Sequence, residues 1–111
     1  MKKFVVIYYA PTSNVEQMSA ASPEEMQKVM GGWMDWIAKC GDALVDIGTP
    51  LGGGQQLSKS GSSPSDQNVT GYSILQAEDI QEAIALLQGH PHLEMGSGFE
   101  IEVHESMPMP M

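Results

Sequence analysis

Apolar and polar residues alternate along this chain in a way typical of four strands and two helices. The segment 3–10 is rich in β-branched and aromatic residues, and both of its alternating sets are apolar, which predicts a strand covered on both faces. Shorter patterns predict three more strands and two amphipathic helices. In chain order we expect a strand over 3–10, a helix over 22–40, a strand over 43–48, a long loop or hairpin over 49–69, a strand over 69–77, a helix over 79–88 and a strand over 99–105.

Local signals mark the ends of both predicted helices. Ser22, Pro23 and Glu25 form a capping box, with a hydroxyl before the helix, proline at its first position and glutamate at its third. Gly41 and Gly89 stand where the two helices should stop. These signals fix the helices more firmly than the periodicity alone would.

The order strand, helix, strand, strand, helix, strand predicts a ferredoxin-like α+β fold for a single domain over 1–111. In this fold, two helices cover one face of a four-stranded antiparallel sheet, and the other face is left bare. Because the first strand is apolar on both sides, we expect the bare face to be covered by a second copy of the chain. The expected assembly is a homodimer of the dimeric α+β barrel type.

The segment 49–69 interrupts this pattern. It is rich in glycine and serine, and compact domains seldom contain a loop of this length without a use for it. We expect a lid, an arm or a hairpin here.

Composition narrows the classes of partner and compartment. The 111 residues include five lysines, no arginine and fourteen acidic residues, for a net charge of −9, so nucleic acid is an unsuitable partner. Cys40 is the sole cysteine, which excludes an internal disulfide and suits the cytoplasm. No apolar run approaches the roughly 18 residues of a membrane span, so we expect no membrane partner.

Asp46, His90 and His92 are the candidate catalytic residues. A carboxylate in an apolar strand either finds hydrogen-bond donors or titrates near neutral pH, where it can act as a general base. Two interpretations of Asp46 follow. Its carboxylate is either a general base or a hydrogen-bond acceptor that stabilises the turn toward Gly48. His90 follows a helix end, which favours its protonated form, and it is either a C-terminal cap or a catalytic partner of Asp46.

Other candidates carry weaker signals. His90 and His92 are too few for a metal site, and we expect no metal or other cofactor. His104 alternates with glutamates in the last strand, which favours an ion pair over a site. Trp33 fits the apolar stripe of the first helix and is assigned to the core, whereas Trp36 flanks that stripe. Trp36, together with Tyr8 and Tyr72, is a candidate to line a pocket for an aromatic ligand.

Several segments resemble the YCII-related family of dimeric α+β barrel proteins. They are FVVIYY at 4–9, GDALVDIGTPL at 41–51, GYSI at 71–74, and GHPHL at 89–93 followed by Gly96 and the last strand. The resemblance spans essentially the whole chain. It implies a ferredoxin-like fold, a homodimer and a pocket between the helices and the sheet.

The resemblance also bears on chemistry. It implies an activity like that of cofactor-independent lyases or dehydrochlorinases, which act on small cyclic or aromatic compounds. In these enzymes, the implied catalytic pair is a histidine on the first helix and an aspartate. Residues 22–40 of this chain contain no histidine, so only Asp46 with His90 or His92 would rebuild such a pair. Two hypotheses follow: a lyase or isomerase with Asp46 as general base, and a non-enzymatic homodimeric binding or interaction module, which the missing histidine favours.

Overall fold

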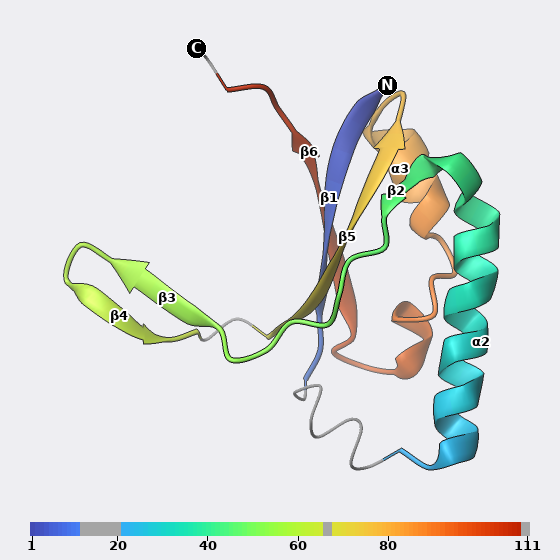
Figure 1. Cartoon of the computed structure of the whole chain (residues 1–111), viewed down its shortest axis with the longest axis horizontal. Helices are drawn as coiled ribbons and strands as arrows, with labels where there is room; N and C mark the ends of the chain where they lie inside the picture. Colours follow the sequence, from blue (N-terminus) through green and yellow to red (C-terminus); the bar gives the residue numbers. More distant parts are fainter. Residues whose placement is uncertain (12–20, 66–67, 110–111) are drawn as a thin grey trace.

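The computed structural model describes residues 1–11, 21–65 and 68–109. Its main sheet has four antiparallel strands in the order β2-β5-β1-β6, so the first and third strands of the predicted pattern lie in the centre (Figure 1). This is the strand order and connectivity of a ferredoxin-like α+β fold, and the predicted fold is confirmed. The strands are β1 (Lys2–Tyr9), β2 (Leu44–Asp46), β5 (Val69–Ala77) and β6 (Glu100–Ser106).

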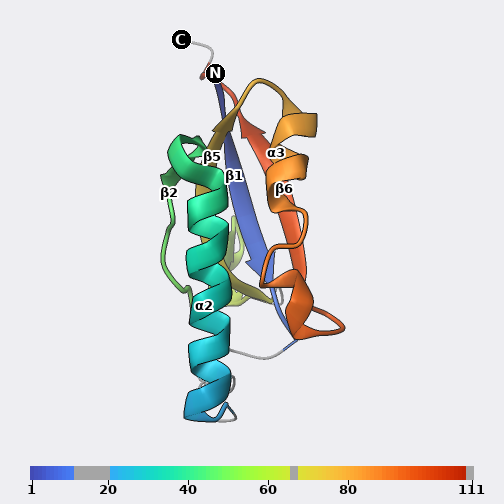
Figure 2. The same cartoon turned by 90° about the vertical axis from the view of Figure 1, so that its right-hand side faces the viewer.

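Both main helices, α2 (Pro23–Cys40) and α3 (Ile80–Leu87), cover the same face of the sheet (Figure 2). Each begins at a side chain that caps its first turn: Ser22 Oγ accepts the Glu25 amide proton at 3.1 Å, and Asp79 Oδ1 accepts that of Glu82 at 2.9 Å. The N-cap predicted at Ser22 is therefore present, and Ser22 Oγ also donates to Glu25 Oε1 at 3.1 Å. Two short 3₁₀ helices, η1 (Gly41–Ala43) and η2 (Leu93–Met95), follow α2 and α3.

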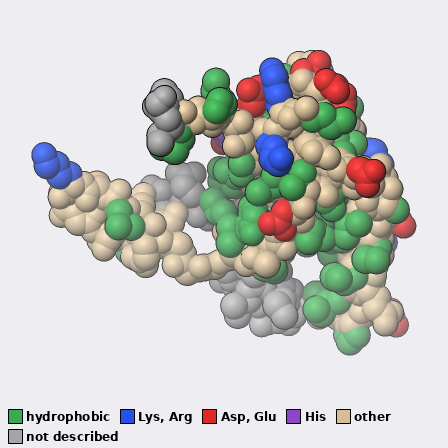
Figure 3. All heavy atoms as spheres, turned by 45° about the horizontal axis from the view of Figure 1, so that its top comes forward, with side chains coloured by type: hydrophobic (Ala, Val, Ile, Leu, Met, Phe, Trp, Pro, Cys, Tyr) green, Lys and Arg blue, Asp and Glu red, His purple; other side chains and the backbone are tan. Residues whose placement is uncertain are grey.

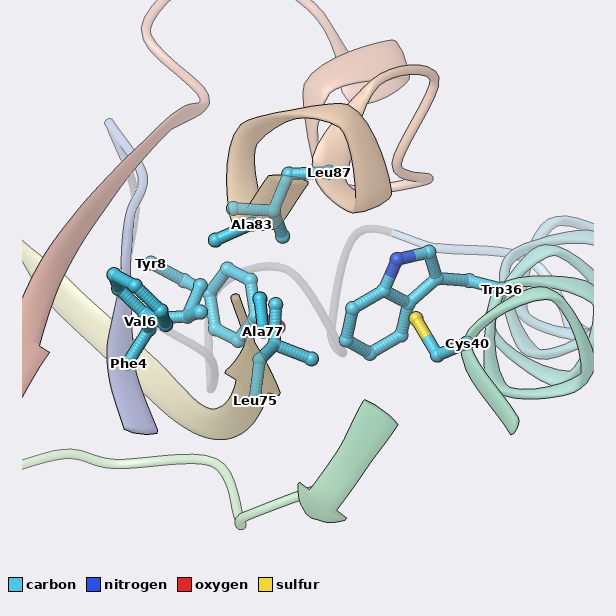
Figure 4. Packing of buried hydrophobic residues seen from close by; sticks show 9 residues of the cluster. All are labelled: Phe4, Val6, Tyr8, Trp36, Cys40, Leu75, Ala77, Ala83 and Leu87. Atoms are coloured by element: carbon cyan, nitrogen blue, oxygen red, sulfur yellow. The ribbon is translucent and has the colours of Figure 1, made fainter. Parts of the chain in front are cut away.

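The core lies between the sheet and the helices (Figure 4). Phe4, Val6 and Leu75 have no exposed surface, because the strand alternation turns them toward α2 and α3. The full cluster of buried residues is Phe4, Val6, Tyr8, Trp36, Cys40, Leu75, Ala77, Ala83 and Leu87.

The other face of the sheet carries the second apolar set of β1. Val5, Ile7 and Tyr9 are half-buried there, and Ile7 lies between Tyr72 of β5 and Glu102 of β6 in the register. The sequence predicts that β1 is covered on both faces. Within one chain, only the face toward the helices is fully covered. We refer to this second surface as the open face.

The strand boundaries hold at β5 but shift at β2. The predicted strand over 43–48 is shorter, because η1 uses its first residue and the chain leaves the sheet after Asp46. The segment 49–69 contains a separate hairpin, made of β3 (Gln55–Ser58) and β4 (Gly61–Pro64). This hairpin projects on the side of the sheet away from the helices (Figures 1 and 2).

Candidate functional site

Three polar side chains are enclosed between the sheet and α2. Ser73 and His90 have no exposed surface, and Tyr8 has only 3%. Tyr8 Oη lies 2.7 Å from Ser73 Oγ and 3.3 Å from His90 Nε2. Since buried polar groups are costly unless they are hydrogen-bonded, these three residues form one structural unit.

The hydrogen bonds of this unit run in one direction. Ser73 Oγ lies 2.6 Å from the Ile47 carbonyl, which can only accept, so the single hydroxyl proton of Ser73 points there. Ser73 must therefore accept the proton of Tyr8 Oη. The backbone amide of His92 donates to His90 Nδ1 at 3.0 Å, which leaves the proton of neutral His90 on Nε2 to be donated to Tyr8. We call His90, Tyr8 and Ser73 the buried relay.

Burial keeps the relay uncharged at neutral pH. It raises the pKa of Tyr8 to about 12, against the opposing effect of the Ser73 hydrogen bond. It lowers the pKa of His90 to about 3, and nearby His92 and Lys39 add to this effect. The expectation that the helix end favours protonated His90 is wrong, because the cost of burying the imidazolium outweighs the attraction of the helix carbonyls.

His92 lies beside the relay and is also held in place by the backbone. Its Nε2 is 2.7 Å from the Tyr9 carbonyl. Burial lowers the pKa of His92, and hydrogen bonds to the backbone of Tyr9 and Glu100 partly oppose that change. His92 is thus a neutral imidazole with a fixed orientation.

Aromatic rings surround His90. The ring centroids of Trp33 and Trp36 lie 4.6 and 4.4 Å from that of His90, both in edge-to-face geometry. Trp36 Nε1 donates to the Leu86 carbonyl at 2.9 Å, which ties α2 to α3. Trp36 is therefore a core residue that joins the two helices.

A close approach of α2 positions the segment that carries both histidines. A Cβ added at Gly32 would lie 3.1 Å from Cβ of Pro91, the residue between His90 and His92. This is tighter than nine in ten real Cβ contacts, so a larger residue at Gly32 would require Pro91 to shift by a few tenths of an ångström. Gly32 thus allows α2 to lie close to the segment that carries both histidines.

An apolar pocket of about 450 Å³ opens beside the relay, between α2 and the segment 47–50. None of the described residues that line it is charged. Most are apolar, and the polar groups among them are hydroxyls, one imidazole, one indole N–H and backbone. The lining residues are Tyr8, Val29, Met30, Trp33, Met34, Ile37, Ile47, Gly48, Thr49, Pro50, Thr70, Gly71, Tyr72, His92 and Met95.

The wall of the pocket at 47–50 is attached to β5. The Ile47 carbonyl accepts from Ser73, and the Leu51 amide donates to the Thr70 carbonyl at 3.0 Å. Gly48 has φ +79°, and a Cβ there would lie 1.8 Å from the Tyr72 carbonyl oxygen. This wall is fixed by backbone contacts, whereas α2 supplies flexible side chains, including the exposed Met30 and Met34.

The structure brings some of the predicted site residues together and separates others. Tyr8, Tyr72 and His92 line the apolar pocket, and His90 lies directly behind Tyr8. Trp36 does not line that pocket; its place is taken by Trp33, which the helical stripe had assigned to the core.

Asp46 is exposed, and its Oδ1 accepts the Gly48 amide proton at 2.9 Å. This is the turn-holding geometry that was one of the two interpretations of the sequence. Asp46 is also absent from the described residues that line the apolar pocket. A catalytic role for Asp46, His90 and His92 stays a prediction.

Ser73 is the site residue that sequence reasoning missed. It occupies an inward position of β5, between buried Gly71 and Leu75. A lone hydroxyl on the buried face of a strand was the available signal, since such a group needs a partner. The identity of that partner depends on strand pairing, which a local pattern does not show.

A second hollow, of about 630 Å³, lies on the outer side of α2 against residues 88–95. Its wall mixes Lys28 and Lys39 with Glu25, Asp35 and Glu94, and Lys39 Nζ donates to the Gln88 carbonyl at 3.0 Å. Although this hollow is larger, its charges of both signs do not converge on one ligand group. The apolar pocket beside the relay is the better candidate site.

Other expected features can be placed as well. His104 Nε2 contacts Glu102 Oε1 on the exposed surface of β6, so the two side chains expected to interact lie together. Within residues 1–11, 21–65 and 68–109, no group of three or more His, Cys, Asp or Glu side chains is arranged to hold a metal ion. In the same part of the chain, no helix has the length and hydropathy needed to cross a membrane.

Comparison with known proteins bears on family and not on activity. The sequence profile of the YCII-related domain matches residues 1–106. A search among curated proteins finds no match. The profile thus spans every strand and helix of the sheet-and-helix body, including the relay and the apolar pocket. On this match the chain belongs to the YCII-related domain family.

Proposed function

We propose that this protein is a homodimer that binds a small, uncharged cyclic or aromatic molecule in the apolar pocket. The observation that carries the proposal is the pocket itself, which has an apolar and aromatic lining without a charged side chain among the described residues. Burying a charged ligand group in such a lining would be costly, so the pocket favours neutral molecules. Trp33 offers a ring surface for stacking.

The homodimer is supported by the open face. Val5, Ile7 and Ile74 form an apolar strip along its centre, flanked by Tyr9 and Tyr72. An apolar strip of this kind on a small domain marks an interaction surface. A second copy that presents the same strip is a self-complementary cover for it. The single cysteine, buried as a free thiol, suits a cytoplasmic location for this dimer.

A cofactor-independent lyase or isomerase is the second candidate function. In that mechanism Asp46 would take a proton from the ligand, and His90 or His92 would stabilise the charge that develops. The neutral, oriented imidazole of His92 at the pocket favours this candidate. The exposure of Asp46 and its hydrogen bond to Gly48 disfavour it, so we place ligand binding first.

Two related fluorescent probes test the binding proposal. N-phenyl-1-naphthylamine is uncharged, and 1-anilinonaphthalene-8-sulfonate is the same molecule with an added sulfonate. We expect saturable fluorescence enhancement with the neutral probe and affinity at least tenfold weaker for the sulfonate. Equal affinity for the two probes, or none for either, would contradict the proposal.

A matched pair of variants locates the binding site. Met34 and Met26 both lie exposed on α2, but only Met34 lines the apolar pocket. Met34→Lys should weaken binding of the neutral probe about tenfold, and Met26→Lys should leave it unchanged. Binding should also persist in Asp46→Asn, because ligand binding does not need a base. An equal effect of the two lysine variants would place the probe outside this pocket.

A further inference from the structure

The β3–β4 hairpin has no packing partner within the described part of its own chain. All eight residues of its two strands are exposed, and Leu57 is 79% exposed. A hairpin of two strands is only marginally stable in water unless something packs against it. We therefore expect the exposed leucine of the hairpin to pack against a surface outside the chain.

The direction of the hairpin identifies that surface. In Figure 1 the helices lie on one side of the sheet and the hairpin projects on the other, and in Figure 2 it lies behind the sheet when the helices face the viewer. It thus stands beside the open face, next to the space that a second copy would occupy. Any molecule packed on the open face would meet the hairpin at its flank.

We propose that the β3–β4 hairpin is a clasp that grips a second copy of this chain packed on the open face. This inference rests on the proposed homodimer and adds a second contact to it. The lengths agree: a strand of four residues spans roughly 13 Å, and two stacked sheets lie about 10 Å apart. The hairpin is therefore long enough to reach the level of the partner's sheet.

Charge supports the same occupant. Lys59, at the turn of the hairpin, is the sole charged residue in the described segment 51–65, whereas the whole chain carries −9. Figure 3 shows a basic group at the end of a projection that carries no acidic group. The edge strand β6 of a second copy offers exposed Glu100 and Glu102 on the open face, opposite Tyr9 and Ile7 in the register. A lone lysine on the clasp thus meets an acidic strand on the partner.

Two variants of equal chemistry test the clasp. Leu57→Asp places a charge in the clasp, and Leu93→Asp places the same charge on η2, on the helix side of the molecule. Dissociation of the dimer on dilution is followed by sedimentation, with circular dichroism to show that the body stays folded. We expect the dissociation constant to rise at least tenfold in Leu57→Asp and to stay within twofold in Leu93→Asp.

Crosslinking locates the contact on the intact chain. Carbodiimide joins a lysine amine directly to a carboxylate, so it reports touching pairs. In an equal mixture of ¹⁴N and ¹⁵N copies, we expect mixed-isotope peptides that join Lys59 to β6. Their absence, or mixed-isotope crosslinks of Lys59 to other segments alone, would overturn the proposed seat of the clasp.

The outcomes separate the two proposals. A particle of 12.0 kDa at all concentrations would overturn the homodimer, and the clasp with it. A dimer of twice that mass whose dissociation constant is unchanged by Leu57→Asp would overturn the clasp and leave the homodimer standing.

Discussion

The phenol oxygen of Tyr8 lies 2.7 Å from the hydroxyl oxygen of Ser73, and this contact joins the two central strands directly beneath α2. The Ser73 hydroxyl in turn donates a hydrogen bond to the carbonyl of Ile47, a residue that lines the apolar pocket. A side chain on β1 therefore helps to fix the position of the pocket wall. The relay links the stability of the core to the shape of the candidate site.

Tyr8→Phe should destabilise the protein by about 1–3 kcal/mol, because it leaves Nε2–H of buried His90 without an acceptor. Tyr9→Phe is the matched control, since Tyr9 lies on the opposite face of the same strand. We expect its effect to stay within about 0.5 kcal/mol. The free energy of unfolding in urea measures both, and equal values for the two variants would contradict the role given to the relay.

Stability should fall as the solution becomes acidic. The pKa of His90 is about 3 in the folded protein and about 6.5 in an unfolded chain, so below pH 6.5 the unfolded chain binds a proton that the folded protein excludes. The loss grows between pH 6.5 and pH 3, by up to about 1.4 kcal/mol per pH unit from this residue. The lowered pKa of His92 adds in the same direction.

Urea midpoints at pH 7.5, 6 and 5 measure this dependence. The same series in His104→Gln is the control, because His104 lies on the exposed surface of β6. The slope should persist in that variant. In addition, the ring signals of His90 in NMR spectra should not titrate down to pH 5, and a midpoint near 6.5 would contradict the burial argument.

Gly48→Ala should cost more than about 2 kcal/mol, because the new Cβ would collide with the Tyr72 carbonyl in a backbone conformation that alanine rarely adopts. Gly53→Ala separates the two causes: φ at Gly53 is +60°, yet nothing lies within 4 Å of its added Cβ. We expect only about 1 kcal/mol there. Thermal unfolding compares the variants, and a similar loss in both would mean that the close approach at Gly48 is unimportant.

Two substitutions at Asp46 distinguish a turn residue from a base. Asparagine keeps an oxygen that can accept the Gly48 amide proton, whereas alanine removes it. We expect Asp46→Asn to be near neutral in stability and Asp46→Ala to lose about 1 kcal/mol. Once a turnover assay exists, a loss of activity in Asp46→Asn at unchanged stability would favour the lyase or isomerase hypothesis.

The fold was accessible from local patterns because its elements carry strong signals of their own. The strand Val69–Ala77 has the boundaries expected from alternation, and Ser22 and Asp79 mark the starts of α2 and α3. The pattern failed at β2, where two of the expected residues, Ile47 and Gly48, leave the strand to form the pocket wall. A short edge strand pairs with only one neighbouring strand. Its ends are therefore set less firmly by its own sequence than the ends of a central strand are.

The candidate site was less accessible because its geometry depends on contacts between distant segments. Tyr8, Tyr72 and His92 were identified as candidates, but Trp33, which packs against the core as expected, also lines this pocket, and Trp36 lines the second hollow instead. A helical stripe shows which face is apolar, and it does not show which part of that face meets a core and which part meets a hollow.

The sequence by itself determined the order of strands and helices, the single apolar core and the second apolar face of β1, since each follows from residues close together in the chain. Tertiary structure decided that His90 is neutral, that Ser73 completes a relay and that the hairpin stands beside the open face. These properties arise where segments separated by many residues meet. The burial of His90 and the direction of the hydrogen bonds in the relay depend on contacts between these segments. No local sequence pattern could therefore have specified them.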